Sequence, residues 1–343
     1  MIAIEMCAGA GGQALGLHNA GFEHEALIEI DEYACATLRE NNQRLGLGWR
    51  DILELDLKVF AEKHAANYQG RVDLLAGGVP CPPFSKAGMQ LGHDDERDLF
   101  PTALECVRLI QPRAVMLENV PGLAERKFDY YREKISESFA EMGYTCDWRL
   151  LQASDFGVPQ LRPRIIFVAF RHEYFQLFRW PTPTTAVPVS VGDALYDLMS
   201  LNGWNGAANW RLQANKIAPT LVGGSKKHGG PDLGPTRAKA QWKNLGVNAH
   251  RVGNDSELPD QNFRGVLSRD GSIREGFENL PLLTLRMAAR IQGFPDNWNF
   301  SGTKTHAYRQ IGNAFPPPVA QAVASEIYRV LEIANNNREV VNG

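Results

Sequence analysis

Short apolar segments alternate with segments of helical spacing along the first half of this chain, and the alternation restricts its fold. Apolar, β-rich runs predict strands at residues 2–6, 25–30, 72–76, 114–117 and 164–170. The intervening residues 13–19, 33–41, 100–110 and 130–142 have helical spacing. The pattern predicts an α/β fold with a doubly wound parallel sheet, which binds ligands at the carboxyl ends of its strands.

Side chains suited to binding or chemistry follow these expected strands. Gly9, Glu29, Asp51, Cys81 and Glu118 are each expected at a strand's carboxyl end. Because such ends meet along one edge of a sheet, the sequence predicts a single active cleft.

The character of the chain changes after about residue 181, where prolines interrupt the pattern. Residues 202–279 show little periodicity and predict a smaller, loop-rich second lobe. The whole chain has a formal charge of −3, but residues 205–290 hold 13 Lys and Arg against 7 Asp and Glu. This asymmetry fits either a lobe that binds a polyanion or an ordinary solvated surface, and charge alone favours neither.

Composition excludes several classes of protein. No apolar run approaches the ~20 residues that span a bilayer, and the first residues resemble a strand rather than a basic leader, so no secretory signal is expected. Five cysteines without a CxxC pair disfavour a disulfide framework and a zinc site, and no metal is predicted. Reduced thiols fit a cytoplasmic protein.

The glycine-rich turn at residues 7–12 leads from the first expected strand into a helix. Such glycines let the backbone approach a nucleotide, although a similar turn often serves packing alone. Glu29 follows about twenty residues later, where a carboxylate can accept both ribose hydroxyls; otherwise it is an exposed strand end. Asp51 could then accept from an adenine amino group while Ile52 covers a face of the ring.

Cys81 lies between Pro80 and Pro82, just after two glycines. A lone cysteine is commonly a buried structural residue, but this rigid, donor-poor setting and the polar stretch that follows favour a nucleophile. Glu118 would project into the same cleft or cap a turn. Arg162 and Arg164 are expected on one face of a strand, where one of them could simply pair with a carboxylate.

Five segments follow one another along the chain: the glycine-rich turn, Pro80-Cys81, Glu118-Asn119-Val120, the Gln160-x-Arg162-x-Arg164 segment and Arg309-Gln310-Ile311-Gly312-Asn313-Ala314. In this order they resemble the motifs of the DNA (cytosine-5)-methyltransferases, particularly bacterial modification enzymes. The resemblance covers nearly the whole chain and is weakest over about 185–280. It departs from the family at Cys7, where a phenylalanine that packs on adenine is usual.

The resemblance implies a role for each matching residue. Cys81 would attack carbon 6 of cytosine, Glu118 would contact nitrogen 3 and the exocyclic amine, and Arg164 would bind the ring carbonyl oxygen with support from Arg162. The S-adenosylmethionine pocket, which would release S-adenosylhomocysteine, would be lined by Cys7, Ala8, Gly9, Ala10, Gly12, Glu29, Ile30, Asp51, Ile52, Gly78, Pro80, Leu99, Asn313 and Ala314.

The same resemblance implies a target-recognition lobe that binds duplex DNA around a flipped cytosine. Its expected DNA contacts are Ser85, Gln90, Arg97, Thr220, Gly223, Gly224, Lys226, Lys227 and Arg237. The catalytic domain would be discontinuous, at 1–180 plus 303–343, with recognition and hinge at 181–302.

We expect a monomer that works in the bacterial cytoplasm at the nucleoid, away from any membrane, with a cognate restriction endonuclease as a possible partner. Three rival functions remain from the sequence: methylation of RNA cytosines, non-catalytic nucleic-acid binding, and nicotinamide-dependent oxidoreduction. The last rests only on the glycine-rich turn. The recognition sequence and the base that removes the carbon 5 proton are not readable.

Overall fold

A computed structural model of the chain describes residues 1–80, 98–224 and 231–342. The chain divides into two compact units. The first contains Met1–Leu151, Pro163–Thr182 and Val319–Gly343, and the second contains Gln152–Arg162 and Pro183–Pro318. The predicted division, 1–180 plus 303–343 against 181–302, stays a prediction. These units differ from it in assigning residues 152–162 and 303–318 to the second unit and residues 181–182 to the first.

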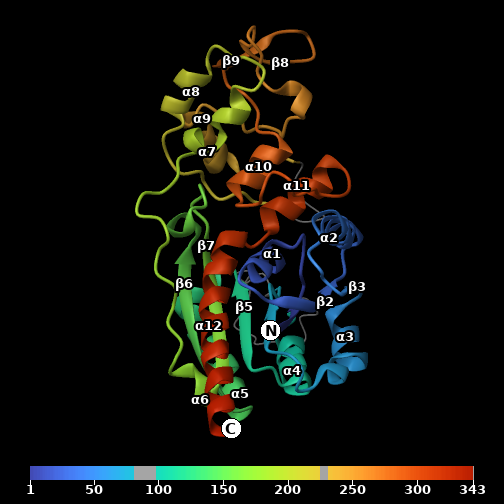
Figure 1. The fold of residues 1–343 in the computed structure, drawn as a ribbon. Coiled ribbons are helices and arrows are strands. Elements are labelled where there is room, and N and C mark those ends of the chain that lie inside the picture. The colour runs from blue at the N-terminus through green and yellow to red at the C-terminus, as the bar shows by residue number, and fades with distance from the viewer. Residues whose placement is uncertain (81–97, 225–230, 343) are drawn as a thin grey trace. The chain divides into compact units, whose positions relative to one another are not determined.

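The first unit is built around a seven-stranded sheet of order β3-β2-β1-β4-β5-β7-β6 (Figure 1). The strands from β3 to β5 pair in parallel, as predicted. β7 instead runs antiparallel to β5, so the sheet is not wholly parallel. The strands are β1 (Ile2–Met6), β2 (Glu23–Glu29), β3 (Asp51–Glu54), β4 (Leu74–Gly77), β5 (Ala114–Asn119), β6 (Tyr144–Gln152) and β7 (Pro163–Arg171).

Helices connect the strands of the first unit and pack on the sheet. α2 shows why they begin and end where they do: Asp31 accepts from the Tyr33 and Ala34 N–H groups, and Gly46 ends the helix at φ 64°. The helices are α1 (Gly12–Asn19), α2 (Glu32–Leu45), α3 (Leu57–Lys63), α4 (Phe100–Ile110), α5 (Asp129–Glu141), α6 (His172–Phe175) and the long α12 (Pro317–Asn342), which begins in the second unit.

The core of the first unit joins segments that are far apart in the sequence. Phe139 of α5 packs on Phe167 of β7, with ring centroids 4.5 Å apart. α12 runs along the sheet (Figure 1) and buries Ile327 and Leu331 completely. Its Tyr328 meets the Phe22 ring edge-on at 5.3 Å. The last residues of the chain therefore complete a core that its first residues begin.

The second unit is richer in loops but is not irregular throughout. Among its described residues, the stretch 202–279, predicted to be loop-rich, contains the helices α8 and α9 and the antiparallel pair β8–β9. Its periodicity is weak because these elements are short and joined by turns. The unit comprises α7 (Val191–Met199), α8 (Ala207–Gln213), α9 (Thr236–Asn244), β8 (Gly265–Leu267), β9 (Ile273–Glu278), α10 (Leu285–Ile291), α11 (Lys304–Asn313) and the start of α12.

The described residues lack two features that would indicate other classes of protein. Among them, no helix is long and apolar enough to cross a membrane. The described part of the chain also holds no cluster of three His, Cys, Asp or Glu side chains suited to a metal ion.

Candidate active site

The glycine-rich turn connects β1 to α1 through left-handed backbone. Gly9 has φ 54° and Gly11 has φ 85°, values that favour glycine, and Cys7 adopts φ 52° despite its side chain. The Ala8 N–H donates to the Ile28 carbonyl of β2 at 3.0 Å, which anchors the turn to the sheet. The structure thus brings Cys7, Ala8, Gly9, Ala10 and Gly12 together at the carboxyl end of β1.

Glu29 ends β2 beside this turn and is 9% exposed. One carboxylate oxygen accepts from the Gly9 N–H at 2.7 Å, and the other accepts from the Ile30 and Asp31 N–H groups at 2.8 Å each. A carboxylate offers about four acceptor positions, so about one is left for a ligand hydroxyl. Glu29 can hold one ribose hydroxyl in this geometry, fewer than the two expected.

Ile30 extends the same edge with an apolar surface. Its side chain is 65% exposed, although most large apolar side chains of the first unit are buried. An exposed isoleucine next to a ribose acceptor fits the face of an adenine ring. The turn, Glu29 and Ile30 together therefore fit the nucleoside part of S-adenosylmethionine.

The prediction that Asp51 ends a strand is wrong. Asp51 begins β3 and pairs with Ala26 in the middle of β2, whereas Glu54 is the residue level with Glu29. Asp56 instead follows the carboxyl end of β3, where it caps α3 by accepting from the Lys58 N–H at 2.7 Å. The Asp56 charge acts on the Cys7 thiol, and the Asp51 charge acts on Tyr68. Ile52 lies within β3, before its end.

Glu118 and Arg164 form an ion pair at the carboxyl end of β5. Arg164 Nε donates to Glu118 Oε1 at 2.7 Å, and both side chains are only 11–13% exposed. A Cβ atom added to Gly78 would lie 3.3 Å from Glu118 Oε2, so glycine permits this close approach. Of the four predicted catalytic residues, the structure brings these two together.

The segment after β4 is tied to the same pair of strands. Asn119, next to Glu118, donates through Nδ2 to the Val79 carbonyl at 2.9 Å and is 6% exposed. The Leu99 N–H, at the start of α4, donates to the Pro80 carbonyl at 3.3 Å. The predicted pocket residues Gly78, Pro80 and Leu99 thus lie close to one another, beside the residues that precede Cys81.

Arg162 does not share a strand face with Arg164, contrary to the prediction. β7 begins only at Pro163, and the Arg162 N–H donates back to the Gln160 carbonyl at 3.0 Å, so the chain turns there instead of extending. The two arginines belong to different compact units. Counted over the whole residue, backbone included, Arg162 is 1% exposed and Arg164 is 9% exposed.

Within the second unit, Arg162 forms the centre of what we name the Gln160–Arg162 cluster. Its guanidinium donates to the carbonyls of Leu221, Gly312 and Ala314 at 2.8, 2.9 and 2.9 Å. Gln160 accepts from the Leu221 N–H at 2.8 Å and donates to Gln292 Oε1 at 2.8 Å. The cluster consists of Gln160, Arg162, Leu221, Gln292, Gly312 and Ala314.

The cluster holds two predicted binding segments of the second unit against each other. Gly223 and Gly312 pack backbone against backbone, so that a Cβ atom on either would clash with the opposite segment. Asn313 Nδ2 donates to the Gly224 carbonyl at 3.4 Å. Thr220 donates through its hydroxyl to the Leu161 carbonyl. Thr220, Gly223 and Gly224, predicted to contact DNA, are therefore neighbours of Asn313 and Ala314, predicted to contact the cofactor.

Burial and then the Glu29 charge raise the pKa of the Cys7 thiol well above its usual range. Cys7 therefore offers a ligand a neutral, apolar contact.

The remaining predicted residues are Arg237, which is exposed on α9, and six that lie outside the described ranges. These six are Cys81, Ser85, Gln90, Arg97, Lys226 and Lys227.

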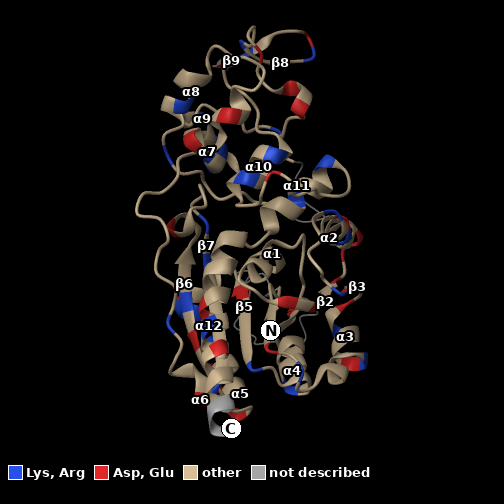
Figure 2. Cartoon of the chain, viewed as in Figure 1, with Lys and Arg blue, Asp and Glu red and all other residues tan. Residues whose placement is uncertain are grey.

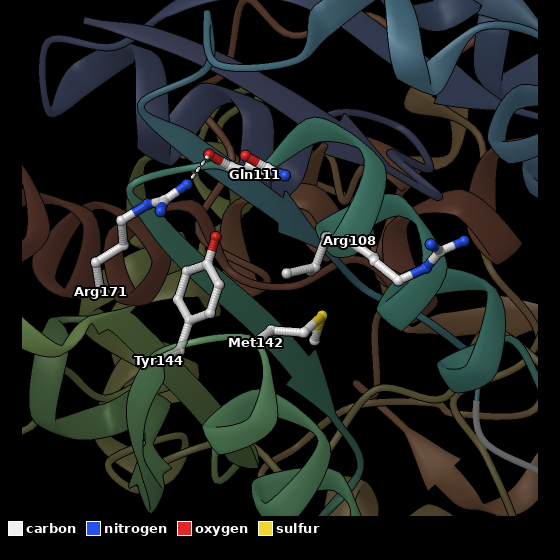
Figure 3. A pocket seen from close by; sticks show the side chains of 6 residues that line it. Arg108, Gln111, Met142, Tyr144 and Arg171 are labelled. Atoms are coloured by element: carbon white, nitrogen blue, oxygen red, sulfur yellow. Dashed lines mark hydrogen bonds between the residues drawn. The ribbon is translucent and has the colours of Figure 1, made fainter.

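A cavity of about 230 Å³ in the first unit lies at the other edge of the sheet (Figure 3). It is lined by Val107, Arg108, Gln111, Met142, Tyr144 and Arg171. Gln111 precedes β5, and Arg171 ends the antiparallel β7 and donates to the Gln111 carbonyl at 2.9 Å. None of the predicted site residues lines this cavity, so we assign it no part in the chemistry.

Sequence reasoning missed Asp56 and Asn119 beside the predicted residues of the first unit, and Gln292 in the Gln160–Arg162 cluster of the second unit. The signal for Asp56 was present, since an acid that directly follows an apolar run and precedes a helical pattern is a typical N-cap. Asn119 is adjacent to Glu118 in the motif itself. Nothing local marks Gln292, because its partner Gln160 is 132 residues away.

Known proteins are similar to this chain over nearly its whole length. A model of the C-5 cytosine-specific DNA methylases matches residues 1–329. The type II methyltransferase M.NgoMIV of Neisseria gonorrhoeae is 51% identical over 97% of this chain and 98% of its own length, and M.NaeI of Lentzea aerocolonigenes is 50% identical over 98% and 76%.

Two solved structures share the fold at low identity. The S. pombe Dnmt2 methyltransferase has a TM-score of 0.60 at 17% identity, covering 98% of this chain and 99% of its own. The Entamoeba histolytica methyltransferase EhMeth has a TM-score of 0.63 at 15% identity, with coverage of 96% and 98%. These findings confirm the predicted methyltransferase fold, function and cofactor. The chain belongs to the C-5 cytosine-specific DNA methylases, enzymes that take a methyl group from S-adenosylmethionine.

Proposed function

We propose that Glu118 and Arg164 hold the target cytosine while the Cys81 thiolate adds to its carbon 6. The observation that carries the proposal is the Glu118–Arg164 ion pair at the carboxyl end of β5, with Gly78 leaving room beside Oε2. Glu118 contacts nitrogen 3 and the exocyclic amine, and Arg164 contacts the ring carbonyl oxygen. Both groups stabilise the electron density that the addition places on the ring.

The covalent step explains why a thiol is needed. Carbon 5 of cytosine is a poor nucleophile, but formation of the Cys81 Sγ–carbon 6 bond turns it into an enamine carbon. S-adenosylmethionine supplies an electrophilic methyl group when bound. A base then removes the carbon 5 proton, and cleavage of the sulfur–carbon bond regenerates the thiolate and the aromatic ring.

For the cofactor, we assign the nucleoside end to the glycine-rich turn, Glu29 and Ile30. Asp56 replaces Asp51 as the carboxylate for the adenine amino group, because Asp56 follows the carboxyl end of β3 and its charge acts on Cys7. Gly78, Pro80 and Leu99 would line the same pocket. Asn313 and Ala314, which belong to the second unit, stay cofactor contacts predicted from the resemblance alone.

Arg162 acts as a positioning residue in this proposal. Its three bonds to backbone carbonyls link the Thr220–Gly224 segment to the end of α11. Thr220 would hold the backbone beside the flipped cytosine. Arg162 itself touches neither the base nor the reacting atoms.

DNA contacts complete the proposal. Ser85, Gln90 and Arg97 would close on the flipped base, Thr220, Gly223 and Gly224 would contact the strand, and Lys226, Lys227 and Arg237 would bind phosphates. The relatives named type II methyltransferases support a modification enzyme that protects DNA from a cognate endonuclease. We further infer a monomer acting in the cytoplasm at the nucleoid.

Bisulfite sequencing of an unmethylated plasmid, incubated with the protein and S-adenosylmethionine, tests the function. Protected cytosines in one short repeated context are expected, and none with the Cys81→Ala variant. Uniform conversion by a wild-type protein that binds S-adenosylhomocysteine in calorimetry would refute DNA as the substrate; transfer RNA would then be tried. Full protection by Cys81→Ala would refute the covalent step.

A further inference from the structure

Three basic groups from separate segments of the second unit gather around one aromatic ring. Lys243 Nζ, on α9, lies 4.5 Å from the centroid of the Phe277 ring, and the Arg274 guanidinium, on β9, lies 4.7 Å from it. The His250 ring lies 5.2 Å from the same centroid. We name Lys243, His250, Arg274 and Phe277 the Phe277 cluster. Phe277 is 9% exposed, so a buried ring fixes the positions of exposed basic groups.

Several other basic side chains of this unit have acidic partners. Lys239 pairs with Asp232 at 2.7 Å, Arg211 with Asp193 at 2.7 Å, and Arg251 with Glu257. Figure 2 shows acidic positions on α7 and basic ones on α10, and Arg290 and Asp197 of these helices pair at 2.5 Å. Within residues 1–80, 98–224 and 231–342, by contrast, neither Lys243 nor Arg274 forms an ion pair with a carboxylate.

The contact between His250 and Arg274 fixes the state of the imidazole. Arg274 Nη1 lies 3.1 Å from His250 Nε2, and because a guanidinium has only donors, Nε2 must accept. His250 is therefore neutral in this arrangement. Partial burial, then the Arg274 cation, lowers the pKa of His250, and Lys239 and Lys243 act in the same direction. Asp232 opposes them, but it is already paired with Lys239.

An anion bound at this position would raise the pKa of His250 and favour its protonated form. A phosphate oxygen can accept from Arg274, from Lys243 and from a protonated His250, and its charge offsets the repulsion among the three cations. Binding would then draw a proton onto His250, because the anion stabilises the imidazolium. Proton uptake and anion binding would favour each other.

We propose that the Phe277 cluster binds backbone phosphates of the DNA substrate and takes up a proton at His250 as it does so. The inference rests on the proposed function for the identity of the ligand. It adds a phosphate site on α9 and β9 that sequence reasoning, which selected Lys226, Lys227 and Arg237, did not predict. DNA affinity should consequently increase as the pH falls toward 6.

The test measures the affinity of a fluorescein-labelled 30-base-pair duplex across a series of NaCl concentrations at pH 6.0 and 8.0. Wild-type protein should bind more tightly at pH 6.0. Arg274→Gln and Lys243→Gln should each weaken binding by roughly 5–30-fold and lower the salt slope by up to about one, as for one lost phosphate contact. His250→Gln should remove most of the pH dependence.

Arg251→Gln is the matched control, because it removes a neighbouring arginine whose charge is already paired with Glu257. It should change the salt slope least. S-adenosylhomocysteine affinity, measured by calorimetry, verifies that every variant is folded. If Arg274→Gln keeps the wild-type slope, or His250→Gln keeps the wild-type pH dependence, the site is wrong. A wild-type protein that neither binds nor methylates duplex DNA would instead refute the proposed function.

Discussion

Arg162 and Arg164 are two residues apart in the chain but differ in what their guanidinium groups contact. Arg164 pairs through Nε with the Glu118 carboxylate at the carboxyl end of β5. Arg162 is buried in the second unit, where it donates to three backbone carbonyls. A guanidinium whose N–H groups donate to backbone carbonyls fixes loops. A guanidinium beside a carboxylate at a strand end still has N–H groups that can donate to a ligand. Residue type and spacing do not separate these roles; burial and partners do.

The largest expected effect tests the chemical half of this comparison. Glu118→Gln keeps the shape of the side chain but removes the carboxylate, so kcat should fall roughly 10²–10⁴-fold. S-adenosylhomocysteine affinity should change little, because Glu118 is not assigned to the cofactor. Glu125→Gln, which removes an exposed carboxylate paired with Lys127, is the control. A kcat within threefold of wild type would remove Glu118 from the chemistry.

Arg162→Met tests the structural half. It leaves the Leu221 and Gly312 carbonyls without these bonds in a buried site, and each such loss costs about 1–3 kcal/mol. We expect the free energy of unfolding to fall by about 2–4 kcal/mol, measured by urea denaturation. Arg164→Met should lower the free energy of unfolding less than Arg162→Met does, but it should lower kcat more. If Arg162→Met lowered kcat without changing the urea midpoint, the positioning role would be contradicted.

A smaller effect distinguishes Asp56 from Asp51. Asparagine is also a good N-cap, so Asp56→Asn should keep α3 intact while removing a charge near Cys7. S-adenosylmethionine affinity, measured by calorimetry, should fall about tenfold, which is about 1.4 kcal/mol. Asp51→Asn, the matched change at the start of β3, should have little effect. A larger loss of affinity in Asp51→Asn than in Asp56→Asn would instead support the prediction made from the sequence, that Asp51 binds the adenine amino group.

Glu5 and His24 extend the comparison to buried titratable groups of the first unit, where Glu5 accepts one backbone hydrogen bond, from Ala14. They lie 3.7 Å apart and are at most 1% exposed. Burial lowers the pKa of His24 to about 3, and burial followed by the Glu29 charge raises the pKa of Glu5. Unfolded values are about 6.5 and 4.3.

The signs of these two pKa shifts predict opposing effects of pH on stability. Between about pH 3 and 6.5 the unfolded chain binds the extra proton at His24, so His24 alone makes stability fall as the pH falls. Above about pH 4.3 the folded chain keeps the extra proton at Glu5, so Glu5 alone makes stability fall as the pH rises. Above about pH 4.3 the two slopes therefore oppose each other for as long as the folded chain keeps the Glu5 proton. Glu5→Gln should remove the opposing slope, so that stability increases more steeply with pH below about 6.5, as measured by urea denaturation; an unchanged pH dependence would contradict it.

Local pattern predicted the sheet and the strand ends that carry Glu29 and Glu118. α4 occupies the predicted residues 100–110, and β1 the predicted residues 2–6, because both have clear apolar periodicity and bounding turns. Asp51 was misplaced because β3 has only four residues and its boundaries carry little signal. Arg162 was misplaced because the period of two assumes an extended chain, while the actual turn depends on partners about 60 and 150 residues away.

The first unit uses three separate pieces of the chain, and this order of assembly has a consequence during synthesis. Its sheet is translated by Arg171, yet α12, with Ile327 and Leu331, emerges only after the whole second unit. At roughly 5–20 residues per second, the interval between Thr182 and Val319 lasts roughly 7–30 s. During that interval Phe22 lacks its edge-on contact with Tyr328. The core of the first unit is therefore completed only after the second unit has been translated.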